Sequence, residues 1–100
     1  MAFRVDFTEL AASDLEDISN FLAIDNPAAA ARVCRGLYEA AISLGQNPLL
    51  GRVTPEYQDE SIRDLVRGNY RIVYLVHADQ ARIEILRIWH GARGYLPRAG

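Results

Sequence analysis

The chain has 100 residues, of which 50% are apolar and 24% charged, and its net charge is −2. This balance is that of an ordinary globular protein and excludes collagen-like, disordered and low-complexity classes, while no apolar run is long enough to span a membrane. The single cysteine, Cys34, excludes an internal disulfide, so we expect one domain over residues 1–100 in a reducing cytoplasm.

The amino-terminal residues predict a short strand followed by a helix. Residues 3–7 alternate apolar and polar side chains, which is the period of a strand. Thr8 is a suitable helix cap, and apolar residues then recur at helical spacing to about Ala23. The opposite side of this helix carries three acids that we expect to be solvated: Asp14, Glu16 and Asp17.

A second predicted helix follows directly. Asn26 is a capping residue, Pro27 suits the first helical position, and Gly45 with Asn47-Pro48 ends the helix. Its expected inner stripe consists of Ala30, Val33, Leu37, Ala41 and Leu44. Because the connection between the two helices is so short, they are expected to form an antiparallel hairpin.

The hydrophobic period changes near residue 62 from that of a helix to that of a strand. Residues 48–61 are rich in turn residues and acids and are predicted to form a loop. Three strands are predicted at residues 62–67, 70–77 and 82–90, separated by tight turns. The order β-α-α-β-β-β predicts an α+β fold in which an antiparallel sheet packs against a two-helix hairpin.

Charge is distributed unequally along the chain. Residues 1–60 hold 4 Arg and 10 acids, a net charge of −6, whereas residues 61–100 hold 7 Arg and 3 acids, a net charge of +4. An acidic or polyanionic partner is therefore expected to contact the second part. Every basic residue is arginine, so no lysine is present to act as base, acid or phosphate ligand.

Several local motifs occur together in the order and spacing of a known family. They are Thr8-Glu9-Leu10-Ala11 with Asp14-Leu15 and Ile18, Asn26-Pro27-Ala28-Ala29-Ala30, Pro48-Leu49-Leu50-Gly51-Arg52, Ile62-Arg63-Asp64-Leu65, Tyr70-Arg71-Ile72-Val73-Tyr74 and Ile85-Leu86-Arg87-Ile88-Trp89-His90-Gly91-Ala92-Arg93. In this combination nearly the whole chain resembles the ParE/RelE toxin superfamily. The resemblance implies the fold of that superfamily and the role of the toxic component of a type II toxin–antitoxin system. It also implies that the protein needs no metal and no cofactor.

The superfamily contains two activities. RelE-like members are ribosome-dependent, metal-independent mRNA endonucleases, whereas ParE-like members poison DNA gyrase. The run from Trp89 to Arg93 resembles the ParE-like members, because the nucleases typically carry further basic residues directly after the last strand and a later tyrosine. We therefore favour a gyrase inhibitor. An mRNA endonuclease, and a degenerate toxin that acts only as a binding module, are the alternatives.

Candidate residues differ between these alternatives. For toxicity or target binding they are Trp89, His90, Arg93, Arg67 and Arg71; for a nuclease, proton transfer and phosphate stabilisation would fall to His90, Arg93, Arg71 and Tyr95. His90 is equally suited to end its strand with a structural hydrogen bond. Trp89 fits either an exposed anchor for a partner or a core position under the helices. Arg67 and Arg71 flank one hairpin and are expected to project near each other.

The resemblance also implies a cognate antitoxin, a ParD-like ribbon-helix-helix protein whose carboxy-terminal segment wraps the toxin in a hetero-oligomer. A helical hairpin beside an arginine-rich sheet suits an acidic amphipathic helix. The expected antitoxin contacts are Leu15, Ile18, Leu22, Leu37, Arg63 and Arg71. No contact with a membrane is expected.

Overall fold

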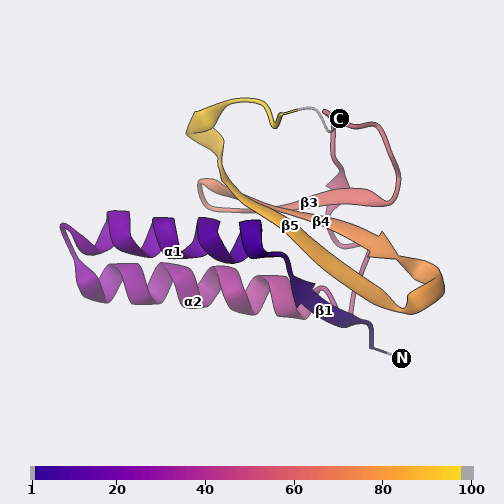
Figure 1. Cartoon of the computed structure of the whole chain (residues 1–100), viewed down its shortest axis with the longest axis horizontal. Helices are drawn as coiled ribbons and strands as arrows, with labels where there is room; N and C mark the ends of the chain where they lie inside the picture. The colour runs from indigo at the N-terminus through magenta and orange to yellow at the C-terminus, as the bar shows by residue number, and fades with distance from the viewer. Residues whose placement is uncertain (1, 98–100) are drawn as a thin grey trace.

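The computed structural model describes residues 2–97 (Figure 1). The helices and strands are β1 (Arg4–Phe7), α1 (Glu9–Ala23), α2 (Pro27–Ser43), β2 (Arg52–Val53), β3 (Ile62–Arg67), β4 (Tyr70–His77) and β5 (Arg82–His90), with short 3₁₀ turns η1 (Ala78–Gln80) and η2 (Gly91–Arg93). The strands form one sheet in the order β1-β5-β4-β3-β2. The predicted α+β class is confirmed, and the three long strands begin and end at the predicted residues.

The sheet differs from the predicted one in two respects. β1 pairs with β5 in parallel, from Arg4 opposite Arg82 to Phe7 opposite Ile85. The short strand β2 pairs with β3 inside the segment predicted to be a loop. The predicted antiparallel pairing is present from β2 to β5, but it does not extend to β1, because periodicity does not report where the helical hairpin returns the chain. β2 was not predicted, because a two-residue strand has no measurable period.

Both helices begin at the predicted caps. The Thr8 hydroxyl accepts a hydrogen bond from the Ala11 N–H, and the Asn26 side chain accepts one from the Ala29 N–H, each at 3.0 Å. Thr8 also donates its hydroxyl proton to the Ile85 carbonyl oxygen at 2.9 Å. The start of α1 is thus bonded directly to β5, and this bond fixes where the helix passes the sheet. Within residues 2–97, neither helix has the length and hydropathy to cross a bilayer.

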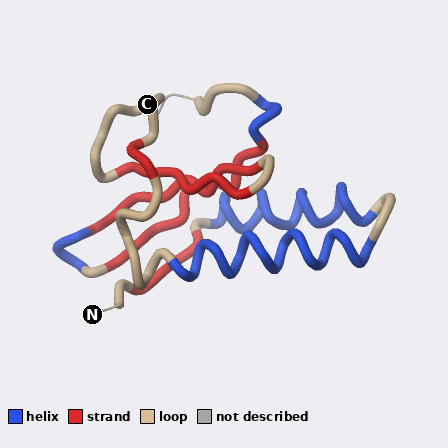
Figure 2. Tube along the Cα trace, turned by 180° about the vertical axis from the view of Figure 1, so that it is seen from behind, coloured by secondary structure: helices blue, strands red, loops and turns tan. Residues whose placement is uncertain are grey.

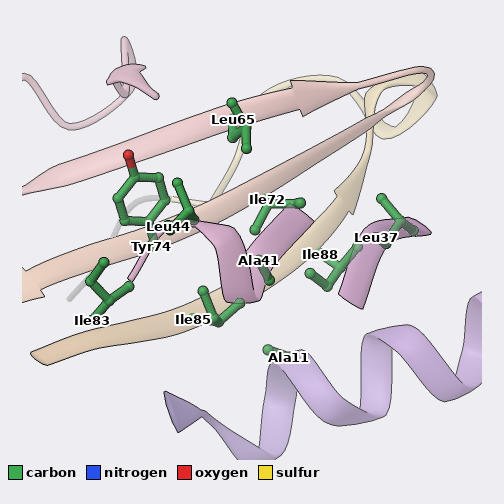
Figure 3. Packing of buried hydrophobic residues seen from close by; sticks show 10 residues of the cluster. All are labelled: Ala11, Leu37, Ala41, Leu44, Leu65, Ile72, Tyr74, Ile83, Ile85 and Ile88. Atoms are coloured by element: carbon green, nitrogen blue, oxygen red, sulfur yellow. The ribbon is translucent and has the colours of Figure 1, made fainter. Parts of the chain in front are cut away.

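The main core lies between the helical hairpin and one face of the sheet (Figure 3). Its buried members are Ala11, Leu37, Ala41, Leu44, Leu65, Ile72, Tyr74, Ile83, Ile85 and Ile88. The predicted inner stripe of α2 is confirmed, with only Val33 half-buried rather than buried. Inside this core the Tyr74 hydroxyl donates to the Pro48 carbonyl at 2.8 Å and accepts from the Gly51 N–H at 2.9 Å, and burial raises its pKa.

The other face of the sheet is covered by the loop after β2 and by the segment after β5, not by α1 or α2 (Figures 1 and 2). Val73, Trp89 and Leu96 form a second buried cluster there, with Tyr57 packed against it. Trp89 is only 4% exposed. Both predicted positions of Trp89 are wrong, because the side chain is buried but lies on the face away from the helices. Alternation along the strands places it there, opposite to neighbouring Ile88.

Candidate functional site

Two of the candidate residues near the end of β5, His90 and Arg93, line a groove of about 390 Å³ between the sheet and α1. Its lining residues are Asp14, Asp17, Ile18 and Phe21 from α1, Tyr70, Ile88 and His90 from the sheet, and Arg93 from η2. The walls are mainly apolar, while Asp17 and Arg93 bring opposite charges to the groove. Such a lining suits a protein segment with apolar anchors better than it suits a polyanion.

His90 forms a hydrogen bond within its own turn. Its Nδ1 accepts from the Ala92 N–H at 3.0 Å, and its ring stands edge-on to Tyr70 with the centroids 5.0 Å apart. In the neutral ring this bond assigns the proton to Nε2. The structural hydrogen bond expected at the strand end is therefore present, and Nδ1 acts as the acceptor that closes the η2 turn. Burial raises the pKa of the neighbouring Tyr70.

The Trp89 side chain contacts the segment that follows β5. Its indole Nε1 donates to the Gly94 carbonyl at 2.9 Å. The Arg93 guanidinium lies over the ring, 4.2 Å from the centroid, and that of Arg87 lies 5.0 Å from it. These distances are those of cation–π contacts. The Arg93 guanidinium is thus held against the Trp89 ring, although Arg93 as a whole remains exposed to solvent.

Asp14 is buried, so the prediction that it is solvated was wrong, while Glu16 and Asp17 are exposed as predicted. Its carboxylate accepts two hydrogen bonds from Arg87, both at 2.8 Å, and a third from the Ile88 N–H at 3.0 Å. Asp14 is buried because β5 extends beyond its pairing with β1, which ends at Ile85. The Ile88 N–H on that unpaired edge needs an acceptor, and the Asp14 carboxylate provides it. The pairing with Asp14 raises the pKa of Arg87.

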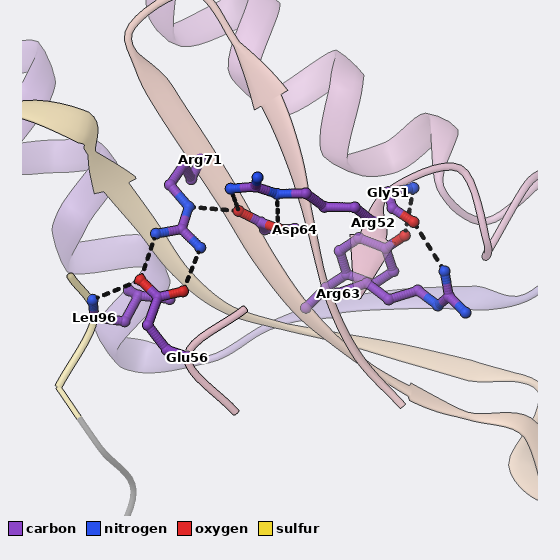
Figure 4. A network of polar contacts seen from close by, with 8 residues as sticks. Gly51, Arg52, Glu56, Arg63, Asp64, Arg71 and Leu96 are labelled. Atoms are coloured by element: carbon purple, nitrogen blue, oxygen red, sulfur yellow. Dashed lines mark hydrogen bonds and ion pairs between the residues drawn. The ribbon is translucent and has the colours of Figure 1, made fainter. Parts of the chain in front are cut away.

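A chain of ion pairs crosses the face of the sheet that carries Trp89 (Figure 4). Asp64 is completely buried and accepts hydrogen bonds from both Arg52 and Arg71. Arg71 also donates two bonds to Glu56, at 2.7 and 2.8 Å. Glu56 in turn accepts from the Leu96 N–H at 3.0 Å. The hydrogen bonds from Arg71, more than any other cause, lower the pKa of Glu56 to about 2, and the same pairing raises the pKa of Arg71.

The structure separates the arginines that were expected to act together. The Arg71 side chain is 12% exposed and enclosed by carboxylates, whereas Arg67 is exposed. Arg71 has the strand parity of Val73 and Arg67 that of Leu65, so the two point to opposite faces of the sheet. The prediction that they project near each other was wrong. Enclosure of Arg71 could not be recognised locally, since Glu56 lies in a loop without a periodic pattern.

The residues expected to contact an antitoxin are mostly committed to packing. Leu37 is buried, and Leu15 and Ile18 are half-buried against the main core. Leu22 is half-buried. Arg63 donates to the carbonyl oxygens of Gly51 and Glu60, at 2.9 and 3.1 Å. The large apolar side chains most exposed to solvent are others, namely Phe21, Ile24 and Tyr95 at 72%, 79% and 86%.

Carboxylates and histidines are not grouped as metal ligands in residues 2–97, where no three His, Cys, Asp or Glu side chains come together. Two of the acids, Glu56 and Asp64, are instead bridged by Arg71.

Residues 5–95 match the family model described as the ParE toxin of the type II toxin–antitoxin system parDE. No curated protein sequence matches the chain. Among solved structures, the chain is similar to one in the RelBE2 toxin–antitoxin complex of Mycobacterium tuberculosis, with a TM-score of 0.69 and 25% identity over 90% of this chain and 99% of that one.

Two further structures share the fold. One is from the chromosomal ParDE system of P. aeruginosa, with a TM-score of 0.71 and 24% identity over 89% of this chain and 96% of that one. The other is a mutant of the E. coli toxin RelE in the free state, with a TM-score of 0.67 and 16% identity over 94% of this chain and 88% of that one. The fold is therefore common to toxins carrying either family name.

Proposed function

The chain belongs to the ParE toxin family and is the toxin of a type II toxin–antitoxin system, and on that premise we propose that it arrests growth by binding DNA gyrase. An antitoxin is its partner, as it is for the toxins in the similar complexes. The mechanism is binding, without a chemical step on nucleic acid.

The observation that carries this proposal is the enclosure of Arg71. A metal-free nuclease needs cations that can approach the developing charge on a phosphate. The hydrogen bonds of the Arg71 guanidinium go to Glu56 and Asp64. The remaining candidates at this end of the sheet, Arg67, Arg93 and Tyr95, are exposed and suited to contact a protein surface.

His90 supports the same choice. A proton shuttle in RNA cleavage must exchange protons with substrate oxygens. Here Nδ1 is occupied by the Ala92 N–H, which leaves only Nε2 for exchange. A binding mechanism needs no proton transfer, so His90 contributes by shaping the turn that carries Arg93.

The antitoxin we propose is a ParD-like ribbon-helix-helix protein that binds as a hetero-oligomer. The mainly apolar groove beside α1 and the exposed Phe21 offer anchor positions for its carboxy-terminal segment. A short neighbouring reading frame that encodes such a protein, co-purifies with this chain and restores growth would support the assignment. Growth arrest that this protein does not relieve would contradict it.

The test of the target uses one protein sample in two assays. Gyrase supercoiling and cleavage of ribosome-bound mRNA are measured with the wild-type chain, His90→Ala, Arg93→Ala and a matched control, Arg4→Ala. Arg4 is an exposed arginine opposite the start of β5, remote from His90 at its end.

For a gyrase inhibitor, Arg93→Ala raises the concentration for half-inhibition about tenfold or more, as loss of one anchor does. His90→Ala changes it less, and Arg4→Ala leaves it unchanged. Ribosome-dependent cleavage that falls about 100- to 10,000-fold in His90→Ala, with gyrase unaffected by the wild type, would replace the proposal by the nuclease alternative.

A further inference from the structure

The segment after β5, residues 91–97, has no regular secondary structure beyond one 3₁₀ turn, yet it is fixed at several points. The Gly94 carbonyl accepts from the Trp89 indole at 2.9 Å, and the Leu96 N–H donates to Glu56 at 3.0 Å. The Pro97 carbonyl accepts from the Tyr57 hydroxyl. The Leu96 side chain is buried beside Trp89. We call residues 91–97 the tail.

Tyr95 lies between two of these fixed points, the Gly94 carbonyl and the Leu96 N–H, while its own side chain extends into solvent. Its residue is 86% exposed, the highest value among the large apolar side chains of residues 2–97. The peptide groups on both sides are held, one through Gly94 and the other through Leu96. Gly94 has φ +79°, which a residue with a side chain rarely adopts, so the turn before Tyr95 depends on glycine. An exposed aromatic ring on a fixed backbone is a ready anchor for a protein partner.

Glu56 connects the tail to the interior of the sheet (Figure 4). One of its oxygens receives both an Arg71 N–H and the Leu96 N–H, and the other receives a second Arg71 N–H. Arg71 is fixed from its other side by Asp64, which is buried in β3. The position of the tail is thereby set by two strands through a continuous path of charge-assisted hydrogen bonds, which are stronger than neutral ones.

We propose that Glu56 is a positioning residue, which, through Arg71 and Asp64, holds the tail so that Tyr95 and Arg93 are presented together to the target of the toxin. This inference rests on the proposed binding function. Arg93 is fixed at the same time by its contact with the Trp89 ring, 4.2 Å from its centroid. A recognition segment held in its bound conformation loses less freedom on binding and therefore binds more tightly.

The experiment compares Glu56→Gln, Tyr95→Ala and the double variant with the wild type. Glu60→Gln is the matched control, because it makes the same change on an exposed glutamate of the same loop. Circular dichroism establishes that each variant is folded at the assay temperature. Acrylamide quenching of Trp89, the one tryptophan in the chain, reports whether the tail still covers it. Half-inhibitory concentration and plateau in the supercoiling assay report target binding.

We expect Glu56→Gln to raise the half-inhibitory concentration about tenfold at an unchanged plateau, and to increase quenching of Trp89. Tyr95→Ala raises that concentration by a similar factor without increasing the quenching. If Glu56 acts through Tyr95, the double variant is hardly worse than either single variant, whereas independent contributions multiply. Glu60→Gln behaves as wild type in every measurement.

Multiplying effects in the double variant, or a Glu56→Gln protein that inhibits like wild type, would overturn the inference. If Glu56→Gln does not fold, Tyr57→Phe takes its place, since it removes only the hydrogen bond to the Pro97 carbonyl. We expect Tyr57→Phe to raise the half-inhibitory concentration by a smaller factor and to show the same non-additivity with Tyr95→Ala. Should the wild type leave gyrase untouched, arrest of growth by graded expression of the same variants replaces supercoiling. In that case the target is wrong, but the coupling between Glu56 and Tyr95 is still tested.

Discussion

Replacing Asp14 by Asn tests the pairing that joins α1 to the open edge of β5. Asp14 accepts two bonds from Arg87 and one from the Ile88 N–H, and its side chain is nearly inaccessible to solvent. Hydrogen bonds to charged groups contribute about 1.5–3 kcal/mol each. The asparagine keeps one accepting oxygen but turns an NH₂ group toward donors, and it leaves the charge of Arg87 without its partner.

We expect Asp14→Asn to lower the free energy of unfolding by about 2–3 kcal/mol, which lowers the melting temperature of a domain this size by about 10–20 °C. Urea unfolding followed by Trp89 fluorescence and by circular dichroism measures the loss, with the slope against urea unchanged. The control is Asp17→Asn, an exposed acid on the same helix, which stays within about 0.5 kcal/mol of wild type. An Asp14→Asn protein as stable as that control would refute the structural role of Asp14.

Three further predictions concern residues before and after the short strand β2. Arg71 lowers the pKa of Glu56 from 4.5 to about 2, so as the pH falls the unfolded chain binds a proton at Glu56 before the folded chain does. The stability that this ion pair contributes above pH 5 is therefore lost as the pH falls toward 2, by at most about 3 kcal/mol. The urea midpoints of wild type and Glu56→Gln should converge over that range, and midpoints that stay equally far apart would argue against this reasoning. Within the described residues the buried Thr54 hydroxyl has no hydrogen-bond partner, so Thr54→Val should raise the thermal midpoint slightly, by the equivalent of up to about 1 kcal/mol, and a lower midpoint would mean that the hydroxyl is satisfied. A Cβ on Gly51 would lie 2.7 Å from the Asp64 carbonyl oxygen, so Gly51→Ala should cost about 1–3 kcal/mol in urea unfolding, and wild-type stability would show that this backbone contact relaxes freely.

The secondary structure could be predicted from the sequence where the signal is local and repeated. The strands β3, β4 and β5 begin and end as expected because they are rich in β-branched and aromatic residues over six to nine positions and are separated by tight turns. The caps Thr8 and Asn26 are equally local, each satisfying an N–H three residues on. The parallel pairing of β1 with β5 involves residues nearly a chain length apart, and no local pattern encodes it.

The candidate site was less predictable, since side-chain partners are chosen across the sequence. Asp14 has the spacing of a solvated helix face, and only the position of Ile88, 74 residues later, explains its burial. Arg71 is one of 11 arginines, and nothing in its own strand distinguishes it from an exposed one. The pairing with Glu56 could be found only by placing a loop of irregular pattern over the sheet. The hydrogen bond of His90 could be expected from the sequence, because its partner, the Ala92 N–H, lies only two residues further along the chain.

The parallel pair at the edge of the sheet also governs when the chain can fold during synthesis. Arg4 and Arg82 are partners, 78 positions apart, and at about 5–20 residues per second the ribosome needs roughly 4–16 s to make the stretch between them. For about the second half of that interval the helical hairpin, which ends at Ser43, has been made, while the sheet that covers its apolar side is still being made. The hairpin β4–β5 closes only at the end, and β1 then joins it as a late, long-range contact of the kind that slows folding. Prematurely terminated chains that stop before β5 lack the strand to which both β1 and the cap of α1 bind, so we expect them not to reach this fold.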